Sequence, residues 1–91
     1  MSIKRIRRAI REAGYEYTAH ALEEMDDDNL TDRDVRWVLL NGTIEAELTH
    51  DPRGTRFVVR GMLRDFAEVE VVCRFLMSGL LQTITAHVLE E

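Results

Sequence analysis

Before Gly42, the apolar residues recur every three or four positions, which is the period of an α-helix with one buried face. This pattern predicts three helices before any strand. The first ends at Gly14, and the second follows Thr18, a residue typical of helix N-caps. The third opens with Thr31 and Asp34, which have the spacing of a variant capping box, and stops at Gly42.

After Gly42 the apolar period becomes two, which is typical of strands with one buried face. Asp51-Pro52-Arg53-Gly54 has the composition of a type I turn between the first two strands. We expect four strands, at about residues 44–48, 56–63, 69–77 and 81–89. Because the links are short and the helices come first, we predict an α+β fold in which N-terminal helices pack on a four-stranded antiparallel sheet.

Length and charge narrow the class of protein. The chain has 91 residues, which is room for a single domain spanning residues 1–91. Its 12 basic and 17 acidic residues give a net charge of −5, which disfavours binding to RNA and to anionic membranes. With Cys73 as the only cysteine and no apolar run long enough to cross a membrane, we expect a cytoplasmic protein. No motif calls for a cofactor or a metal ion.

The second predicted helix carries the first group of chemical interest. His20 and Glu24 are four residues apart and therefore share one helix face. They could supply two metal ligands, but a tetrahedral site needs a third, so a solvated or capping pair is the alternative. His20 alone lies in the first turn, where the helix dipole favours the neutral ring that can accept a proton. The alternative is a histidine that only packs and hydrogen-bonds the backbone.

Strand alternation suggests a second group. If the apolar series that includes Val59, Cys73, Ile84 and Ala86 faces the helices, the opposite face collects Arg56, Arg60, Arg74, Thr83, Thr85 and His87. Arginines, hydroxyls and a histidine on one face suit phosphate contacts and acid–base chemistry. The same face also carries Val58, Met62, Val72 and Leu76, so a surface for a partner or a second subunit is the alternative.

Several short segments, in this order and spacing, resemble a family of small prokaryotic proteins, the domain-of-unknown-function family 4258. They are Tyr17-Thr18-x-His20-Ala21, Met25, Leu30-Thr31-x-x-Asp34-Val35, Asn41-Gly42, Asp51-Pro52-Arg53-Gly54, Arg56-Phe57-Val58-Val59 and Ile84-Thr85-Ala86. That family is similar to the RelE/ParE-like toxin superfamily. The resemblance implies a RelE-like fold, a bacterial or archaeal toxin–antitoxin system with an antitoxin as partner, and ribosome-linked mRNA cleavage or inhibition of another target. His20 matches the histidine of the family pattern.

Two functional hypotheses therefore stand beside each other, and they leave open whether the chain is an enzyme. In the first, the chain is toxin-like and acts on RNA, with His20 as candidate base and Arg60, Arg74 and His87 as candidate phosphate or acid–base groups. In the second, it is a non-catalytic interaction module or homodimer that uses the exposed sheet face. Because Glu24 and Asp28 repeat at four-residue intervals after His20, we expect weak RNA binding.

Overall fold

The computed structural model describes residues 2–90. It contains the helix caps and the turn that the sequence predicts. The helices are α1 (Ser2–Arg11), α2 (Ala19–Asp27) and α3 (Asp32–Asn41); the strands are β1 (Tyr15–Tyr17), β2 (Thr43–Leu48), β3 (Arg56–Met62), β4 (Glu68–Phe75) and β5 (Leu81–Val88). Thr18 caps α2 by accepting a hydrogen bond from the Ala21 N–H, and Thr31 and Asp34 form the predicted capping box of α3. The Gly54 N–H donates to the Asp51 carbonyl at 3.0 Å, which closes the predicted turn.

The sheet differs from the prediction in having five strands. Strands β2 to β5 form the expected antiparallel meander, but β1 adds to its edge, and the order is β1-β5-β4-β3-β2. Because β1 runs parallel to β5, the sheet is mixed, and the prediction of four antiparallel strands is wrong. Three residues between the end of one helix and the cap of the next carry too little periodicity to indicate a strand.

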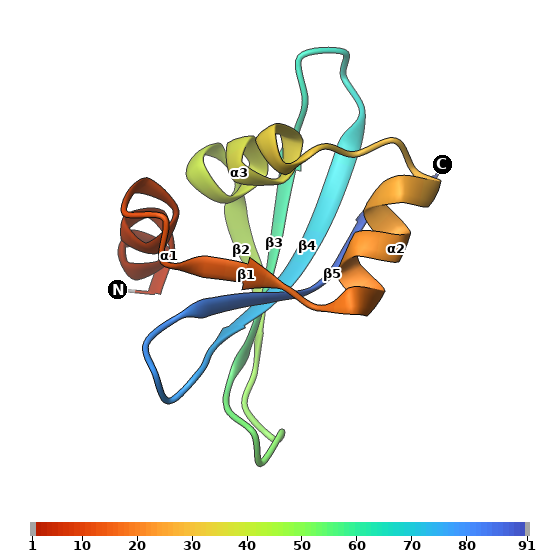
Figure 1. The fold of residues 1–91 in the computed structure, drawn as a ribbon. Coiled ribbons are helices and arrows are strands. Elements are labelled where there is room, and N and C mark those ends of the chain that lie inside the picture. Colours follow the sequence, from red (N-terminus) through yellow and green to blue (C-terminus); the bar gives the residue numbers. More distant parts are fainter. Residues whose placement is uncertain (1, 91) are drawn as a thin grey trace.

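All three helices pack on one face of the sheet, with α1 and α2 at opposite ends of the helix layer and α3 between them (Figure 1). The core lies between the layers and includes Ile6, Ile10, Val35, Val38, Leu39, Val59, Val69, Val71, Cys73, Leu81 and Ala86. We call this side of the sheet the covered face and the other the open face. Within residues 2–90, no helix is long and apolar enough to cross a membrane.

A β-bulge in β5 changes which residues reach the covered face. Val72 pairs with Thr85 but Cys73 pairs with Thr83, so Ile84 is the extra residue. Thr83, expected on the open face, is instead completely buried on the covered face, and Ile84, expected to face the helices, is absent from the core among the described residues. A single inserted residue shifts the alternation, and the sequence gives no local sign of it.

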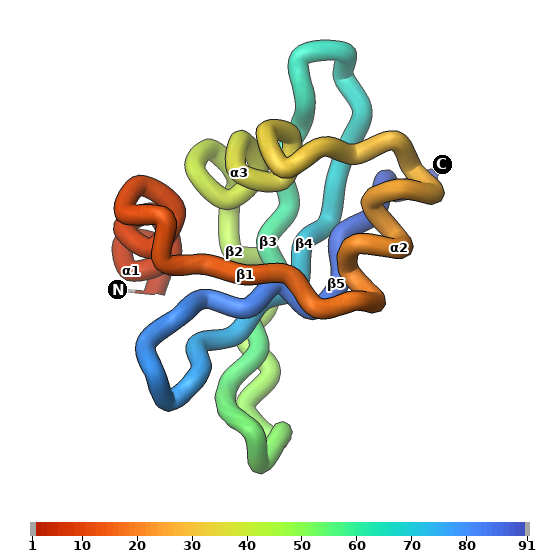
Figure 2. The backbone as a smooth tube through the Cα atoms, viewed as in Figure 1, coloured from red at the N-terminus to blue at the C-terminus, as the bar shows by residue number. Residues whose placement is uncertain are grey.

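Both edges of the sheet are protected from pairing with another strand. The outer strand β2 has a bulge between Ile44 and Ala46 and exposes Glu45 and Glu47, which are common means of blocking an edge. At the other edge, β1 covers the first residues of β5 and helix α2 lies beside the rest (Figure 1). The β2–β3 hairpin and the β3–β4 loop extend from opposite ends of the sheet (Figure 2).

Candidate functional site

The open face consists of three rows of side chains that cross the strands. The first, the arginine row, contains Arg56, Arg74, Gln82 and Glu16, which are direct neighbours on β3, β4, β5 and β1. The second, the apolar strip, contains Ala46, Val58, Val72 and Thr85. The third, the glutamate row, contains Thr43, Arg60, Glu70 and His87. An apolar centre between polar borders is typical of an interaction surface.

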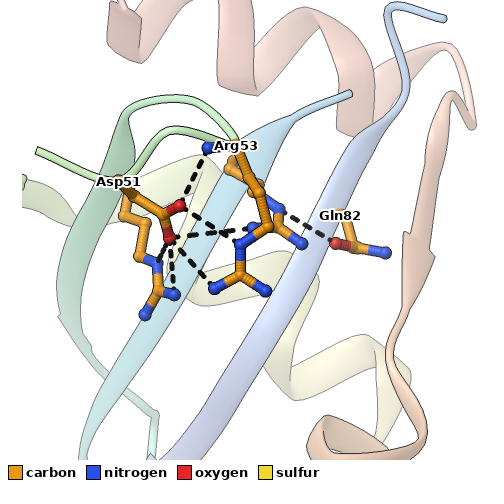
Figure 3. A network of polar contacts seen from close by, with 5 residues as sticks. Asp51, Arg53 and Gln82 are labelled. Atoms are coloured by element: carbon orange, nitrogen blue, oxygen red, sulfur yellow. Dashed lines mark hydrogen bonds and ion pairs between the residues drawn. The ribbon is translucent and has the colours of Figure 1, made fainter. Parts of the chain in front are cut away.

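The arginine row continues into the β2–β3 hairpin through Asp51 (Figure 3). The Asp51 carboxylate accepts hydrogen bonds from Arg53 and from Arg56 Nε, the latter at 2.8 Å. Hydrogen bonds from the Arg53 side chain and backbone, together with the one from Arg56, hold the pKa of Asp51 well below its usual range. On the other side, Arg74 Nε donates to Gln82 Oε1 at 3.1 Å, and Gln82 Nε2 donates to Glu16 Oε2 at 3.1 Å.

The glutamate row holds two of the four predicted site residues. Arg60 Nε donates to Glu70 Oε2 at 3.1 Å, and Glu70 is the strand neighbour of His87. Arg60, Arg74 and His87 share the open face, as predicted, opposite the buried residues of β3, β4 and β5. However, Arg74 lies four residues along β4 from Glu70, about 13 Å at the usual strand rise. The predicted residues therefore fall into two groups.

The fourth residue, His20, joins His87 rather than the arginines. Glu24 lies between the two histidines: its Oε1 is 3.4 Å from His20 Nε2, and its Oε2 is 3.9 Å from His87 Nδ1. We call these three residues the histidine cluster. The His20 side chain is 63% exposed, whereas that of His87 is 35% exposed, so the first ring faces water and the second is largely buried.

Glu24 and Asp28 hold α2 against the edge of β5. The Ala86 N–H donates to Glu24 Oε1 at 3.2 Å, and the Val88 N–H donates to Asp28 Oδ2 at 2.8 Å. Four residues of helix rise about 6 Å and two residues of strand about 6.6 Å, so the two spacings match. The carboxylates that were expected chiefly to repel phosphate thus satisfy backbone donors that β1 does not reach.

A shallow groove of about 430 Å³ adjoins the histidine cluster. It is lined by Glu24, Asp27, Asp28, His87, Val88, Leu89 and Glu90. Four carboxylates and no arginine or lysine line this groove among the described residues, so it repels phosphate groups. Within residues 2–90, no group of three or more histidine, cysteine, aspartate or glutamate side chains is arranged to hold a metal ion.

Cys73 is not a nucleophile in this fold. It lies on the covered face and is completely buried. Burial raises the pKa of its thiol to about 12, so the reactive thiolate does not form near neutral pH.

Sequence reasoning missed a group of polar side chains on the covered side. The hydroxyls of Tyr15 and Tyr17 both donate to the Asp32 carboxylate at the start of α3, Tyr15 at 3.0 Å. Burial raises the pKa of Tyr17 strongly and that of Tyr15 less, and the hydrogen bonds to Asp32 add to both shifts. The spacing of two tyrosines at alternate positions was the available signal, but their partner comes from a distant helix.

The apolar residues expected to form one exposed patch do not lie together. Val58 and Val72 are strand neighbours in the apolar strip. The glutamate row separates them from Met62 at one end, and the arginine row separates them from Leu76 at the other. The two valines are therefore the central apolar contact of the open face.

Comparison with known families identifies the chain. The family described as Domain of unknown function (DUF4258) matches residues 17–87. The chain belongs to this family. No curated protein and no solved structure gives a match, so the likeness to RelE/ParE-like toxins stays a prediction. The match begins at Tyr17 and ends at His87, and it includes both histidines of the histidine cluster.

Proposed function

We propose that this chain is a non-catalytic interaction domain that forms a homodimer through the open face of its sheet. The observation that carries the proposal is the apolar strip between two polar rows. Each arginine in those rows contacts a carboxylate or an amide of its own chain: Arg56 contacts Asp51, Arg74 contacts Gln82, and Arg60 contacts Glu70. Binding along an RNA backbone needs a series of cations that carboxylates do not neutralise, and this face offers at most the one group of arginines around Asp51, whereas an apolar contact needs no free cation.

The protected edges support a contact through the face rather than through an added strand. The bulge and glutamates of β2 disfavour pairing at one edge. At the other, Glu24 and Asp28 already accept the hydrogen bonds that an incoming strand would need. The open face carries two neighbouring valines, Val58 and Val72, that remain partly exposed and are not covered by a helix.

The distribution of charge on the open face favours a second copy of this chain as the partner. The arginine row, with Asp51 and Arg53, has three arginines against two carboxylates. The glutamate row, with the adjacent Glu68, has one arginine against two carboxylates. A two-fold axis along the apolar strip would place each row over the oppositely charged row of the second copy.

The experiment is a comparison of two lysine substitutions on the same face. We expect sedimentation to show a dimer for the wild type and a folded monomer for Val72→Lys, because the latter places a charge in the apolar strip. Met62→Lys is the matched control: Met62 is 55% exposed on the same face but outside the strip, so this variant should remain dimeric. A wild type that is monomeric at 1 mM would contradict the proposal.

Toxin-like action on RNA is the second candidate function. It is supported by the family's resemblance to such toxins and by the histidine cluster, in which two rings flank one carboxylate. In that case the partner on the open face would be an antitoxin. Growth arrest on expression and RNA cleavage that are lost in both His20→Ala and His87→Ala would favour this candidate over the interaction domain.

RNA binding can also be tested by replacing carboxylates of α2 with arginine, provided that the carboxylates bonded to β5 are left unchanged. Changing Glu24 and Asp28 to arginine would remove two hydrogen-bond acceptors along with two negative charges. Glu23→Arg with Asp27→Arg instead changes exposed positions of α2. If RNA is a ligand of this surface, the second pair should strengthen binding and steepen its salt dependence.

A further inference from the structure

Three guanidinium groups lie around a single carboxylate where the arginine row meets the β2–β3 hairpin (Figure 3). Arg53 and Arg56 use five nitrogen contacts of 2.6 to 3.2 Å to reach the two oxygens of Asp51. Arg74 Nη1 is 3.9 Å from Asp51 Oδ2, beyond hydrogen-bond distance. The Asp51 carboxylate thus accepts hydrogen bonds from Arg53 and Arg56 but not from Arg74.

Arg74 is the unexplained member of this group. Its side chain is 14% exposed, and its Nη1 is buried without a hydrogen-bond partner among residues 2–90. A buried guanidinium nitrogen in this state loses its hydration without compensation, which is unfavourable unless another group completes the site. Three positive charges against one negative charge add to that cost.

The rest of the arginine row fixes the direction of Arg74. Its Nε donates to Gln82, which is itself held by Glu16 on β1. The guanidinium is therefore oriented before any ligand arrives, with Nη1 on the side of Asp51. A site whose donors are oriented in advance loses little side-chain entropy on binding.

We propose that Arg53, Arg56 and Arg74 form a binding site for a phosphate group, and that Asp51 occupies it as an internal substitute for the ligand. Arginine forks suit phosphate oxygens, and a phosphate monoester carries up to two negative charges and several acceptors where a carboxylate carries one charge and two oxygens. Asp51 lies in the turn between β2 and β3, outside both strands, so its side chain can move away from the arginines without breaking the strand pairing. This site borders the apolar strip and lies in the row that the proposed dimer would place over the glutamate row of the second copy, so the titrations compare the variants at a protein concentration where sedimentation shows a monomer. The absence of phosphate binding would not contradict the dimer.

The test uses inorganic phosphate titrated into the protein at constant ionic strength, followed by calorimetry and by the arginine Nε–H signals in NMR spectra. We expect Asp51→Ala to bind phosphate at least tenfold more tightly than the wild type, because the internal carboxylate no longer competes. Adding Arg74→Gln to that variant should weaken binding at least tenfold. Adding Arg60→Gln is the matched control, because Arg60 lies on the same face but contacts Glu70, and binding should stay within twofold.

A second variant and a second ligand keep the test decisive. Asp51→Asn preserves the shape of the hairpin and should also bind phosphate more tightly than the wild type, with an unchanged far-ultraviolet spectrum. A nucleoside 5′-monophosphate in place of free phosphate distinguishes the sources: equal affinity means that the phosphate alone is recognised, and tighter binding means a nucleotide monoester. The proposal is wrong if neither Asp51 variant binds phosphate more tightly than the wild type, or if Arg60→Gln costs as much as Arg74→Gln.

Discussion

Both faces of the sheet carry valines, but the valines of one face are buried in the core and those of the other are partly exposed. Val71 and Val72 are adjacent in β4; Val71 lies on the covered face and is completely buried, whereas Val72 lies on the open face and is partly exposed. The valines differ only in whether helices cover them. Apolar content alone therefore does not separate the core from an interaction surface; the placement of the helix layer does.

Polar groups also behave differently on the two faces. On the covered side, Tyr15 and Tyr17 share Asp32 where burial opposes ionisation, and their pKa values rise. On the open face, Asp51 is stabilised as a carboxylate by arginines, and its pKa falls. The surroundings of the two tyrosines thus favour their neutral form, whereas the arginines around Asp51 favour its ionised form.

The sharpest test of this comparison is to shorten the two adjacent valines. Val71→Ala should lower the free energy of unfolding by about 2 kcal/mol, because it removes buried methyl groups and leaves a cavity. Val72→Ala should cost less than about 0.5 kcal/mol in the monomer, because water already reaches that side chain. Urea unfolding of both variants in the Val58→Lys background, where the proposed dimer cannot form, measures the difference. Equal losses would mean that the open face is as well covered as the core.

We expect a smaller loss of stability from substitutions at the edge of β5, where side chains of α2 bond to the strand backbone. Glu24→Ala should reduce the free energy of unfolding by about 1–2 kcal/mol, because it leaves the partly buried Ala86 N–H without its acceptor. Asp28→Ala should cost less, since the bond to the Val88 N–H is exposed to water. Hydrogen exchange at these two amides, with Glu23→Ala as a control on the same helix, should show faster exchange only at the amide that lost its acceptor.

We expect the smallest effect from the ionisation of the tyrosines. It can be followed directly, because the chain has only two tyrosines. Their raised pKa values mean that the unfolded chain ionises first as the pH rises above about 10, the ordinary tyrosine value. The stability that they contribute is therefore complete below that pH and is lost above it. Asp32→Asn should lower both pKa values and reduce this alkaline loss.

Tyrosinate absorbance at 295 nm and the melting temperature at pH 8 and pH 10.5 measure both effects of Asp32→Asn. Asp34→Asn serves as the control, because Asp34 lies in the same helical turn but bonds to the Thr31 N–H. Unchanged absorbance in Asp32→Asn would show that burial alone sets the tyrosine pKa values.

The features that could be predicted from the sequence are those that depend on a few neighbouring residues. Thr18 and Thr31 satisfy N–H groups three residues ahead, and Asp51 and Gly54 close their turn over the same span. Alternation placed Arg60, Arg74 and His87 on one face because side chains in β3, β4 and β5 follow the backbone pleat. These interactions leave a pattern that can be read without knowing the fold.

The contacts between residues far apart in the chain could not be predicted and became visible in the folded structure. The pairing of β1 with β5, the contact of Glu24 with the β5 edge and the approach of Arg74 to Asp51 each join residues far apart in the chain. Such contacts follow from how the helix layer and the strands pack, and a single bulge was enough to move Thr83 from the expected face to the other. No local hydrogen-bond or periodicity rule specifies them, because their energy depends on partners that folding brings together.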